Sequence, residues 1–247
     1  SDVISGIEWC INSLAALNIR VINLSIGSEA QESFRADPLC RVTTAAWRHG
    51  ITVCAAAGNS GPESATINTP GINPVIITVG NLDDQNTLTN IDDFINPSSS
   101  RGPTLEGILK PDLVAPGTRI TSLKVGGGYT TLSGTSMATP LVSGAAALIL
   151  QKWSELKPDQ IKRLLLRKAR DLGVGPNLQG AGALDLEAIF EEEIEKNRSH
   201  NNDTGPNLGG MLLKAFLKLV FKNNSASKRN TNLGNDILKL IVNLLGS

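Results

Sequence analysis

Seven residues, Gly134-Thr135-Ser136-Met137-Ala138-Thr139-Pro140, carry the strongest signal in this sequence. A glycine-led turn enters a long apolar helix here, which we expect to run from about Ser136 to Trp153. Backbone N–H groups are unpaired and the dipole is positive at a helix N-terminus, so a developing oxyanion would be stabilised there. We place Pro140 in the first turn, where its missing N–H costs nothing. Taken alone, the stretch also fits Ser136 as an ordinary N-cap.

A second stretch, Ala55-Ala56-Ala57-Gly58-Asn59-Ser60-Gly61-Pro62, follows an apolar strand expected over residues 51–57. Sites in open α/β sheets form at the carboxyl ends of parallel strands. The side-chain amide of Asn59 could therefore donate a hydrogen bond to the same oxyanion. By itself, an Asn beside a Gly in such a loop is usually turn chemistry.

The pattern of elements predicts an α/β fold. We expect helices over residues 3–17 and 38–48, and short apolar strands over residues 21–27, 51–57 and 75–79. Further helices are expected over 136–153, from 158 to before Gly173, and from about Asp185. Strands that are apolar on both faces and joined by helices indicate a buried, mostly parallel sheet flanked by helices.

Together these stretches resemble the subtilisin-like serine proteases (peptidase S8). Within that family, the sequence motifs are most similar to those of the bacterial AprX-like branch. Residues 21–27, 100–104, 110–117 and 179–182 fit the same family. The resemblance covers about residues 3–190. It implies a three-layer subtilisin-like fold missing its N-terminal portion, with residues 1–190 as a partial peptidase domain and 191–247 as a C-terminal extension.

The resemblance also implies an activity and a set of site residues. The parent protein would be a serine endopeptidase that hydrolyses polypeptides through an acyl-enzyme on Ser136. The Ser136 N–H and the Asn59 side chain would form the oxyanion hole. Substrate-binding residues would be Ser25, Ile26 and Gly27, which pair with an extended polypeptide, and Ala56, Ala57 and Gly58, which wall the first specificity pocket.

The Asp and His of the catalytic triad have no counterpart in this sequence. In the family they precede the serine in D-[ST]-G and H-G-T motifs, and neither motif occurs here. His49 lies before strand 51–57 and Asn59 lies past its other end, roughly 20 Å away at ~3.3 Å per residue. His200 lies in an Asn-rich linker. We therefore expect upstream sequence to be missing, an unpaired sheet edge, and no activity from the chain alone.

The alternative interpretation is a catalytically dead, protease-like module that binds a peptide or a partner protease. It would keep the edge segment and the pocket without doing chemistry. The retention of both Ser136 and Asn59 counts against it, because a binding module needs neither.

The composition of the chain bears on its partners, its cofactors and its relation to membranes. The 247 residues carry 23 Lys+Arg and 23 Asp+Glu, so net charge gives no reason to expect nucleic acid as a partner. The three cysteines lack zinc-type spacing, and we expect buried, inert thiols, no metal and no cofactor. The family resemblance implies that an intact member could bind calcium, but the calcium site typical of secreted subtilisins is built largely from upstream residues, so none is expected in this chain. No apolar run is long enough for a membrane span. Localisation leans weakly to the cytoplasm, and the oligomeric state stays open.

The composition shifts beyond Glu191. Two segments, Met211–Lys222 and Leu233–Leu245, have the pattern of amphipathic helices. Docking on the domain or self-association is the simpler interpretation. Contact with a membrane surface is a less favoured alternative.

Overall fold

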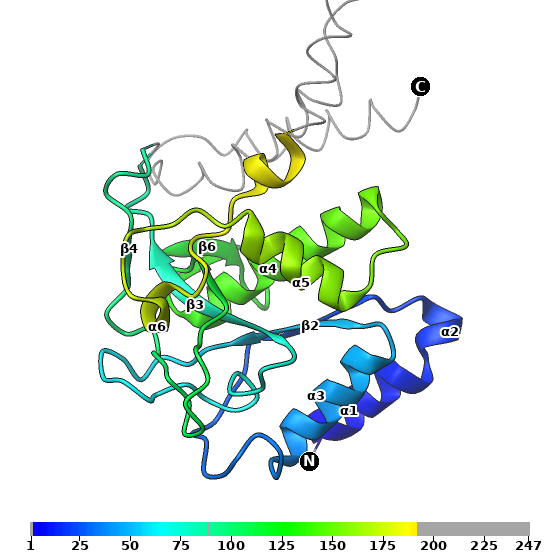
Figure 1. Cartoon of the computed structure of the whole chain (residues 1–247). Coiled ribbons are helices and arrows are strands. Elements are labelled where there is room, and N and C mark those ends of the chain that lie inside the picture. Colours follow the sequence, from blue (N-terminus) through cyan, green and yellow to red (C-terminus); the bar gives the residue numbers. More distant parts are fainter. Residues whose placement is uncertain (1, 88, 192–247) are drawn as a thin grey trace, which may run out of the picture.

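The structure of the protein, a computed structural model, describes residues 2–87 and 89–191 (Figure 1). The strands are β1 (Val21–Leu24), β2 (Thr52–Ala56), β3 (Ile77–Asp83), β4 (Phe94–Ile95), β5 (Leu113–Pro116), β6 (Ile120–Leu123) and β7 (Tyr129–Leu132). The helices are α1 (Asp2–Asn12), α2 (Leu14–Leu17), α3 (Pro38–Arg48), α4 (Thr135–Lys152), α5 (Pro158–Arg167) and α6 (Pro176–Gln179), followed by helical residues 186–191. The two predicted amphipathic helices and His200 lie outside the described residues.

The main sheet is mostly parallel, as predicted. β1 pairs with β2, β2 with β3 and β3 with β5, all in parallel, and the short β4 adds an antiparallel contact to β3. Leu24 lies opposite Ala55, so β1 and β2 end at the same edge of the sheet. Among the described strands, β1 has a neighbour on one side only. β6 and β7 form a separate hairpin.

Helices cover both faces of the sheet, which confirms the predicted α/β class. α4 packs across β1, β2, β3 and β5, while α3 contacts β2 and packs beside α1 (Figure 1). α4 turns a face of small and aliphatic side chains to the sheet, including Ala138, Val142, Ala145 and Ile149, all buried. β2 is buried along its whole length because it lies between the two helical layers.

Several predicted elements differ from the structure at their ends. The helix expected over residues 3–17 is two helices, α1 and α2, because Ser13 adopts a turn conformation (φ −92°, ψ 0°) between them. The strand expected over residues 75–79 begins at Ile77 and continues to Asp83. The carbonyls of residues 74–76 point at the Lys162 ammonium and so do not begin the strand.

The α3 helix begins as the sequence predicts. Asp37 is its N-cap and accepts a hydrogen bond from the Cys40 N–H at 2.8 Å, and Pro38 occupies the first helical position. His49 caps its carboxyl end.

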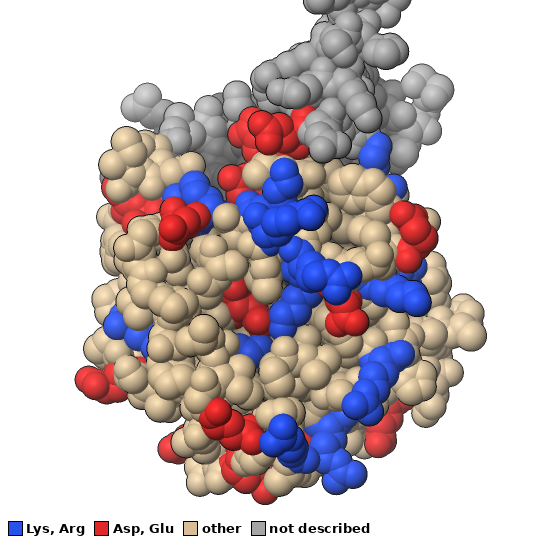
Figure 2. All heavy atoms as spheres, viewed as in Figure 1, with Lys and Arg blue, Asp and Glu red and all other residues tan. Residues whose placement is uncertain are grey.

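Figure 2 shows basic and acidic side chains interspersed over one face of the protein. None of the helices described is both long and apolar enough to cross a bilayer. Cys40 and Cys54 are buried, as predicted, and burial raises the pKa of both thiols to about 12. Cys10 is only half-buried, so the prediction of a buried thiol does not hold there.

Candidate active site

A cavity of about 270 Å³ opens where β1 and β2 end and α4 begins. Its lining residues are Ser25, Ile26, Gly27, Ala56, Gly58, Asn59, Asn68, Thr135 and Ser136. The structure thus brings together seven of the eight predicted site residues from three separate stretches of sequence.

Ala57 is the predicted site residue that does not line this cavity. Its side chain is fully buried in a small core cluster with Cys40, Ile67 and Ile72. Successive side chains along an extended segment point to opposite faces, so Ala56 and Ala57 cannot both face the pocket. Of the two, Ala56 faces it.

The Asn59 side chain is held in one orientation by Thr135. Asn59 Oδ1 accepts hydrogen bonds from the Thr135 N–H at 2.9 Å and from Thr135 Oγ1 at 3.2 Å. Because the carbonyl end of the amide is engaged twice, the Nδ2 end is the one available to donate into the cavity.

The first turn of α4 presents a backbone donor beside this amide. The Met137 and Ala138 N–H groups both donate to the Gly134 carbonyl, while in the described part of the chain the Ser136 N–H has no acceptor. Gly134 has φ +147°, and a Cβ there would come within 3.2 Å of the Asn59 amide. Glycine is therefore required for both the turn and the approach of Asn59.

Pro140 lies deeper in α4 than the sequence analysis placed it. The helix begins at Thr135, so Pro140 is in its interior and not in the first turn. A proline there cannot donate to the carbonyl four residues earlier, which is that of Ser136. Ser25 Oγ donates to this carbonyl instead, at 2.8 Å.

Ser25 and Ser136 are joined by a second, reciprocal hydrogen bond. Ser136 Oγ donates to the Ser25 carbonyl at 3.1 Å. The hydroxyl and the carbonyl of Ser136 are both held by the segment that follows β1, so this segment and the start of α4 form one hydrogen-bonded unit.

The segment after β1 has free main-chain groups along the cavity. Among the described residues, the N–H and C=O groups of Ile26 and Gly27 have no hydrogen-bond partner. The next residue, Ser28, forms an antiparallel bridge with Thr69. A Cβ on Gly27 would lie 3.0 Å from the Thr69 carbonyl, so a side chain at this position would crowd the bridge.

The sequence analysis missed two residues of this site, Asn68 and Thr135. Thr135 stands inside the first quoted stretch, and its position next to Ser136 was the available signal. Asn68 precedes the Thr69-Pro70 peptide and carries no signal in the sequence. It lies against Gly58, where φ is +110° and a Cβ would come within 2.8 Å of the Asn68 side chain.

None of the side chains that line the cavity ionises near neutral pH, so the polarity of the cavity comes from amides, hydroxyls and main-chain groups. His49 lies at the other end of β2, exposed, with Nδ1 2.8 Å from the Ala45 carbonyl. Within residues 2–87 and 89–191, no group of three or more His, Cys, Asp or Glu side chains could hold a metal ion.

A mostly parallel sheet between helices, with a cavity at the carboxyl ends of its strands, defines an α/β protein with a site in the usual place for that class. Comparison with known proteins gives the family. The model of the subtilase family, Peptidase_S8, matches residues 1–184. The chain therefore belongs to the subtilase family.

Several relatives are similar in sequence or structure. Serine protease AprX of Bacillus subtilis (strain 168) is 45% identical over an alignment of 209 residues that covers 76% of this chain and 47% of AprX. Subtilisin DY of Bacillus licheniformis is 35% identical, over 77% of this chain and 62% of that protein. The solved structure of Sphericase matches with a TM-score of 0.64 at 30% identity, over 74% of this chain and 62% of that one. The chain thus spans about half to two thirds of the length of these relatives.

Proposed function

We propose that this chain is the part of a serine endopeptidase that carries the nucleophile, Ser136, and the oxyanion hole. The observation that carries the proposal is the single cavity in which Ser136, Asn59 and the Ser25–Gly27 segment meet. Membership of the subtilase family supports the same chemistry. The substrate would be an extended polypeptide.

In the proposed reaction, Ser136 Oγ attacks the carbonyl carbon of the scissile peptide bond while a base takes its proton. The carbonyl oxygen becomes an oxyanion, and the Ser136 N–H and Asn59 Nδ2 donate to it. Collapse of this intermediate breaks the C–N bond, the base returns the proton to the leaving amine, and water then releases the acyl group.

The substrate backbone would lie against Ile26 and Gly27. Their main-chain groups are free in the described structure and can form the antiparallel pairing that extended peptides make with a strand edge. Ala56 and Gly58 leave open volume beside Asn59, which suits a large apolar substrate side chain.

The base would come from sequence that this chain does not contain. A base must lie within hydrogen-bond reach of Ser136 Oγ, and none of the residues lining the cavity can act as one. We place the His and its orienting Asp on an upstream segment with H-G-T and D-[ST]-G motifs. On binding, that His would replace the Ser25 carbonyl as the partner of the Ser136 hydroxyl.

A fluorophosphonate probe tests this proposal. The chain is treated with the probe alone and together with the upstream part of a subtilase that carries both motifs, and the adduct is located by intact mass and peptide mapping. We expect labelling in the mixture, on Ser136. Labelling of another residue, or none in either sample, would contradict the proposal and favour the binding-module alternative.

Two variants and one control sharpen the result. Ser136→Ala should abolish labelling, and Asn59→Ala should slow it by about 10²–10³-fold, the range seen when subtilisin itself loses its Asn donor. Ser60 is the exposed residue next to Asn59, and Ser60→Ala should label at the rate of the unchanged chain.

A further inference from the structure

A series of side-chain hydrogen bonds leads from the interior of α4 to Ser136. Ser143 Oγ donates to Asn23 Oδ1 at 2.9 Å, and Asn23 Nδ2 donates to Ser25 Oγ, also at 2.9 Å. Ser25 Oγ in turn donates to the Ser136 carbonyl at 2.8 Å. We call Ser143, Asn23 and Ser25 the hydrogen-bond relay. Asn23 and Ser143 do not line the cavity, and the proposed reaction assigns no role to either.

The helix and the strand bring these residues together by their own periodicities. Ser136 and Ser143 are seven residues apart in α4, which is about two turns, so they lie on the same face of the helix. Asn23 and Ser25 are two residues apart at the end of β1, and alternate residues of an extended segment share a face. Because α4 packs against β1, the two pairs face each other.

The amide of Asn23 sets the direction of the relay. An amide nitrogen can only donate a hydrogen bond, and an amide oxygen can only accept one. Since Nδ2 faces Ser25, the Ser25 hydroxyl oxygen accepts from it, and the single hydroxyl hydrogen is left for the Ser136 carbonyl. If the amide oxygen faced Ser25 instead, it would take that hydrogen from the carbonyl.

Ser143 holds the oxygen end of this amide toward α4. Its hydroxyl lies 2.9 Å from Asn23 Oδ1 and 3.2 Å from the Thr139 carbonyl. The Thr139 carbonyl lies four residues before Ser143 in the helix, so the Ser143 N–H is already its partner. Ser143 is buried, whereas Asn23 is exposed, so the fixed end of the relay lies in α4.

Ser136 relies on the relay because Pro140 removes a hydrogen bond of the helix. Pro140 has no N–H to offer to the Ser136 carbonyl, and Ser25 supplies a donor in its place. The Ser25 carbonyl also accepts from the Ser136 hydroxyl. Ser25 therefore holds both the carbonyl and the hydroxyl of Ser136, while Asn23 fixes the direction of the Ser25 hydroxyl.

We propose that Asn23 is a positioning residue for Ser136, that it acts through the hydroxyl of Ser25, and that Ser143 anchors its amide. The role of Ser136 as nucleophile rests on the proposed function, but the direction of the hydrogen bonds does not. Asn23 touches neither the substrate nor the reacting atoms. It keeps the main chain and the hydroxyl of Ser136 in the geometry that attack on a peptide bond requires.

Asn23→Asp tests the direction of the relay, because a carboxylate has the shape of the amide but cannot donate to Ser25. Cell-free synthesis with carbonyl-13C serine and 15N methionine gives one cross-peak in an HNCO spectrum, since Met137 follows a serine and the other methionine follows a glycine. A hydrogen bond to a carbonyl moves its 13C resonance downfield. We expect Asn23→Asp to move the Ser136 resonance upfield at pH 7, close to its position in Ser25→Ala.

Acid should reverse this shift. A protonated carboxyl donates and accepts as the amide does, so the resonance should return toward that of the unchanged chain as the pH falls from about 7 to about 4. Cys54, opposite Asn23 in β2, stays protonated because burial raises its pKa to about 12. Asn12→Asp makes the same change at the exposed end of α1 and should not move the resonance. A Ser136 resonance that Asn23→Asp leaves in place would overturn the proposal.

The rate of phosphonylation tests the consequence for the nucleophile. In the mixture with the upstream segment, Asn23→Asp should label about tenfold more slowly than the unchanged chain, the effect of losing one hydrogen bond. In a Ser25→Ala background the same change should leave the rate unaltered, because the relay acts through Ser25. A loss that persists in that background, or no loss at all, would overturn the positioning role. If the unchanged chain does not label, the proposed function fails, and the carbonyl resonance still decides the direction of the relay.

Ser143→Val and Ser143→Thr test the anchor without adding a charge. The two new side chains have the same shape, and the hydroxyl that donates to Asn23 remains in Thr alone. We expect Ser143→Val to label about threefold more slowly than Ser143→Thr and to move the Ser136 resonance part of the way upfield. If Asn23→Asp does not fold, this pair carries the test, and identical Ser136 resonances in the two variants would overturn the proposal.

Discussion

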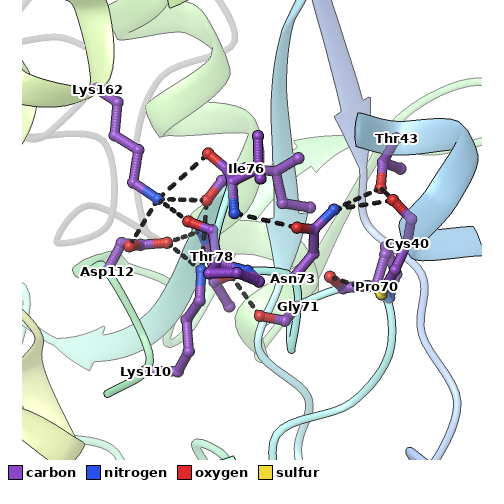
Figure 3. Close-up of polar contacts among 12 residues, drawn as sticks. Cys40, Thr43, Pro70, Gly71, Asn73, Ile76, Thr78, Lys110, Asp112 and Lys162 are labelled. Atoms are coloured by element: carbon purple, nitrogen blue, oxygen red, sulfur yellow. Dashed lines mark hydrogen bonds and ion pairs between the residues drawn. The ribbon is translucent and has the colours of Figure 1, made fainter. Parts of the chain in front are cut away.

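The cavity at Ser136 and the buried cluster of Lys110, Asp112 and Lys162 use main-chain groups of opposite polarity. At the start of α4, the Ser136 N–H is left without an acceptor and faces an open cavity. In the cluster, the carbonyls of residues 74–76 lie 2.7–3.4 Å from the ammonium of Lys162, which belongs to the same chain (Figure 3). The Ser136 N–H stays open to the cavity in which a substrate is expected. The carbonyls of residues 74–76, in contrast, are bonded to a side chain of the same protein.

The largest loss of stability is expected from Asp112→Asn, which removes the carboxylate that lies between two largely buried lysines. Breaking a buried ion pair by removing one partner costs about 3–5 kcal/mol. Urea unfolding should show a loss of that size. Asp2→Asn makes the same chemical change at an exposed position and should have little effect. Equal stability of the two variants would show that the ion pairs of Asp112 do not stabilise the fold.

The next largest effect is a dependence of the free energy of unfolding on pH, which arises from Lys110. Its pKa is about 8 in the folded protein against 10.5 ordinarily, so between these values the unfolded chain binds more protons. Stability contributed by this residue should therefore rise from pH 8 to 10.5, by about 3 kcal/mol at 1.36 kcal/mol per pKa unit.

Urea unfolding of the unchanged chain and Lys110→Met across this pH range isolates the effect. The unchanged chain should gain stability relative to the variant as the pH rises. Parallel curves for the two proteins would show that Lys110 keeps its ordinary pKa.

Substitution by alanine should change the free energy of unfolding in opposite directions at two glycines of the α4 region. Gly134→Ala places a Cβ at φ +147° and 3.2 Å from the Asn59 amide, and should cost about 1–3 kcal/mol. Gly144 is exposed in the interior of α4 with no atom within 4 Å of an added Cβ, so Gly144→Ala should stabilise by about 0.5–1 kcal/mol. Similar free energies of unfolding for both variants would contradict the special role of Gly134.

The smallest expected change in stability comes from the hydrogen bond that Ser25 donates to the Ser136 carbonyl. With Pro140 present, Ser25→Ala leaves this carbonyl without its donor and should cost about 1–2 kcal/mol. In Pro140→Ala the helix supplies an N–H, so the same change should cost less. A double-mutant cycle should give a coupling of about 0.5–1 kcal/mol, and additive effects would show that Ser25 does not replace the missing helical hydrogen bond.

The sequence predicted the cavity well because its residues occupy short, contiguous stretches. Gly134 to Pro140 and Ala55 to Pro62 each contain their own turn chemistry, and strand order placed them at one edge of the sheet. The exception, Ala57, depends on the direction of a single side chain in an extended segment. Pro140 was misplaced because the first residue of a helix is hard to fix from sequence.

The cluster of Lys110, Asp112 and Lys162 was not predictable in the same way. Lys110 and Asp112 stand in a segment that supported the family resemblance, yet their partners are Lys162 and the carbonyls of residues 74–76, far away in the sequence. Main-chain carbonyls leave no trace in the amino-acid sequence. The same carbonyls explain why β3 begins later than its apolar pattern indicated.

A crystal structure of the phosphonylated chain in complex with the upstream segment tests the central claim most directly. The account predicts phosphorus on Ser136 Oγ, with one phosphonyl oxygen about 2.7–3.1 Å from both the Ser136 N–H nitrogen and Asn59 Nδ2. It also predicts that Asn59 Oδ1 keeps its hydrogen bonds to Thr135. A phosphonyl oxygen that faces solvent, with the Asn59 amide turned away from it, would contradict the account.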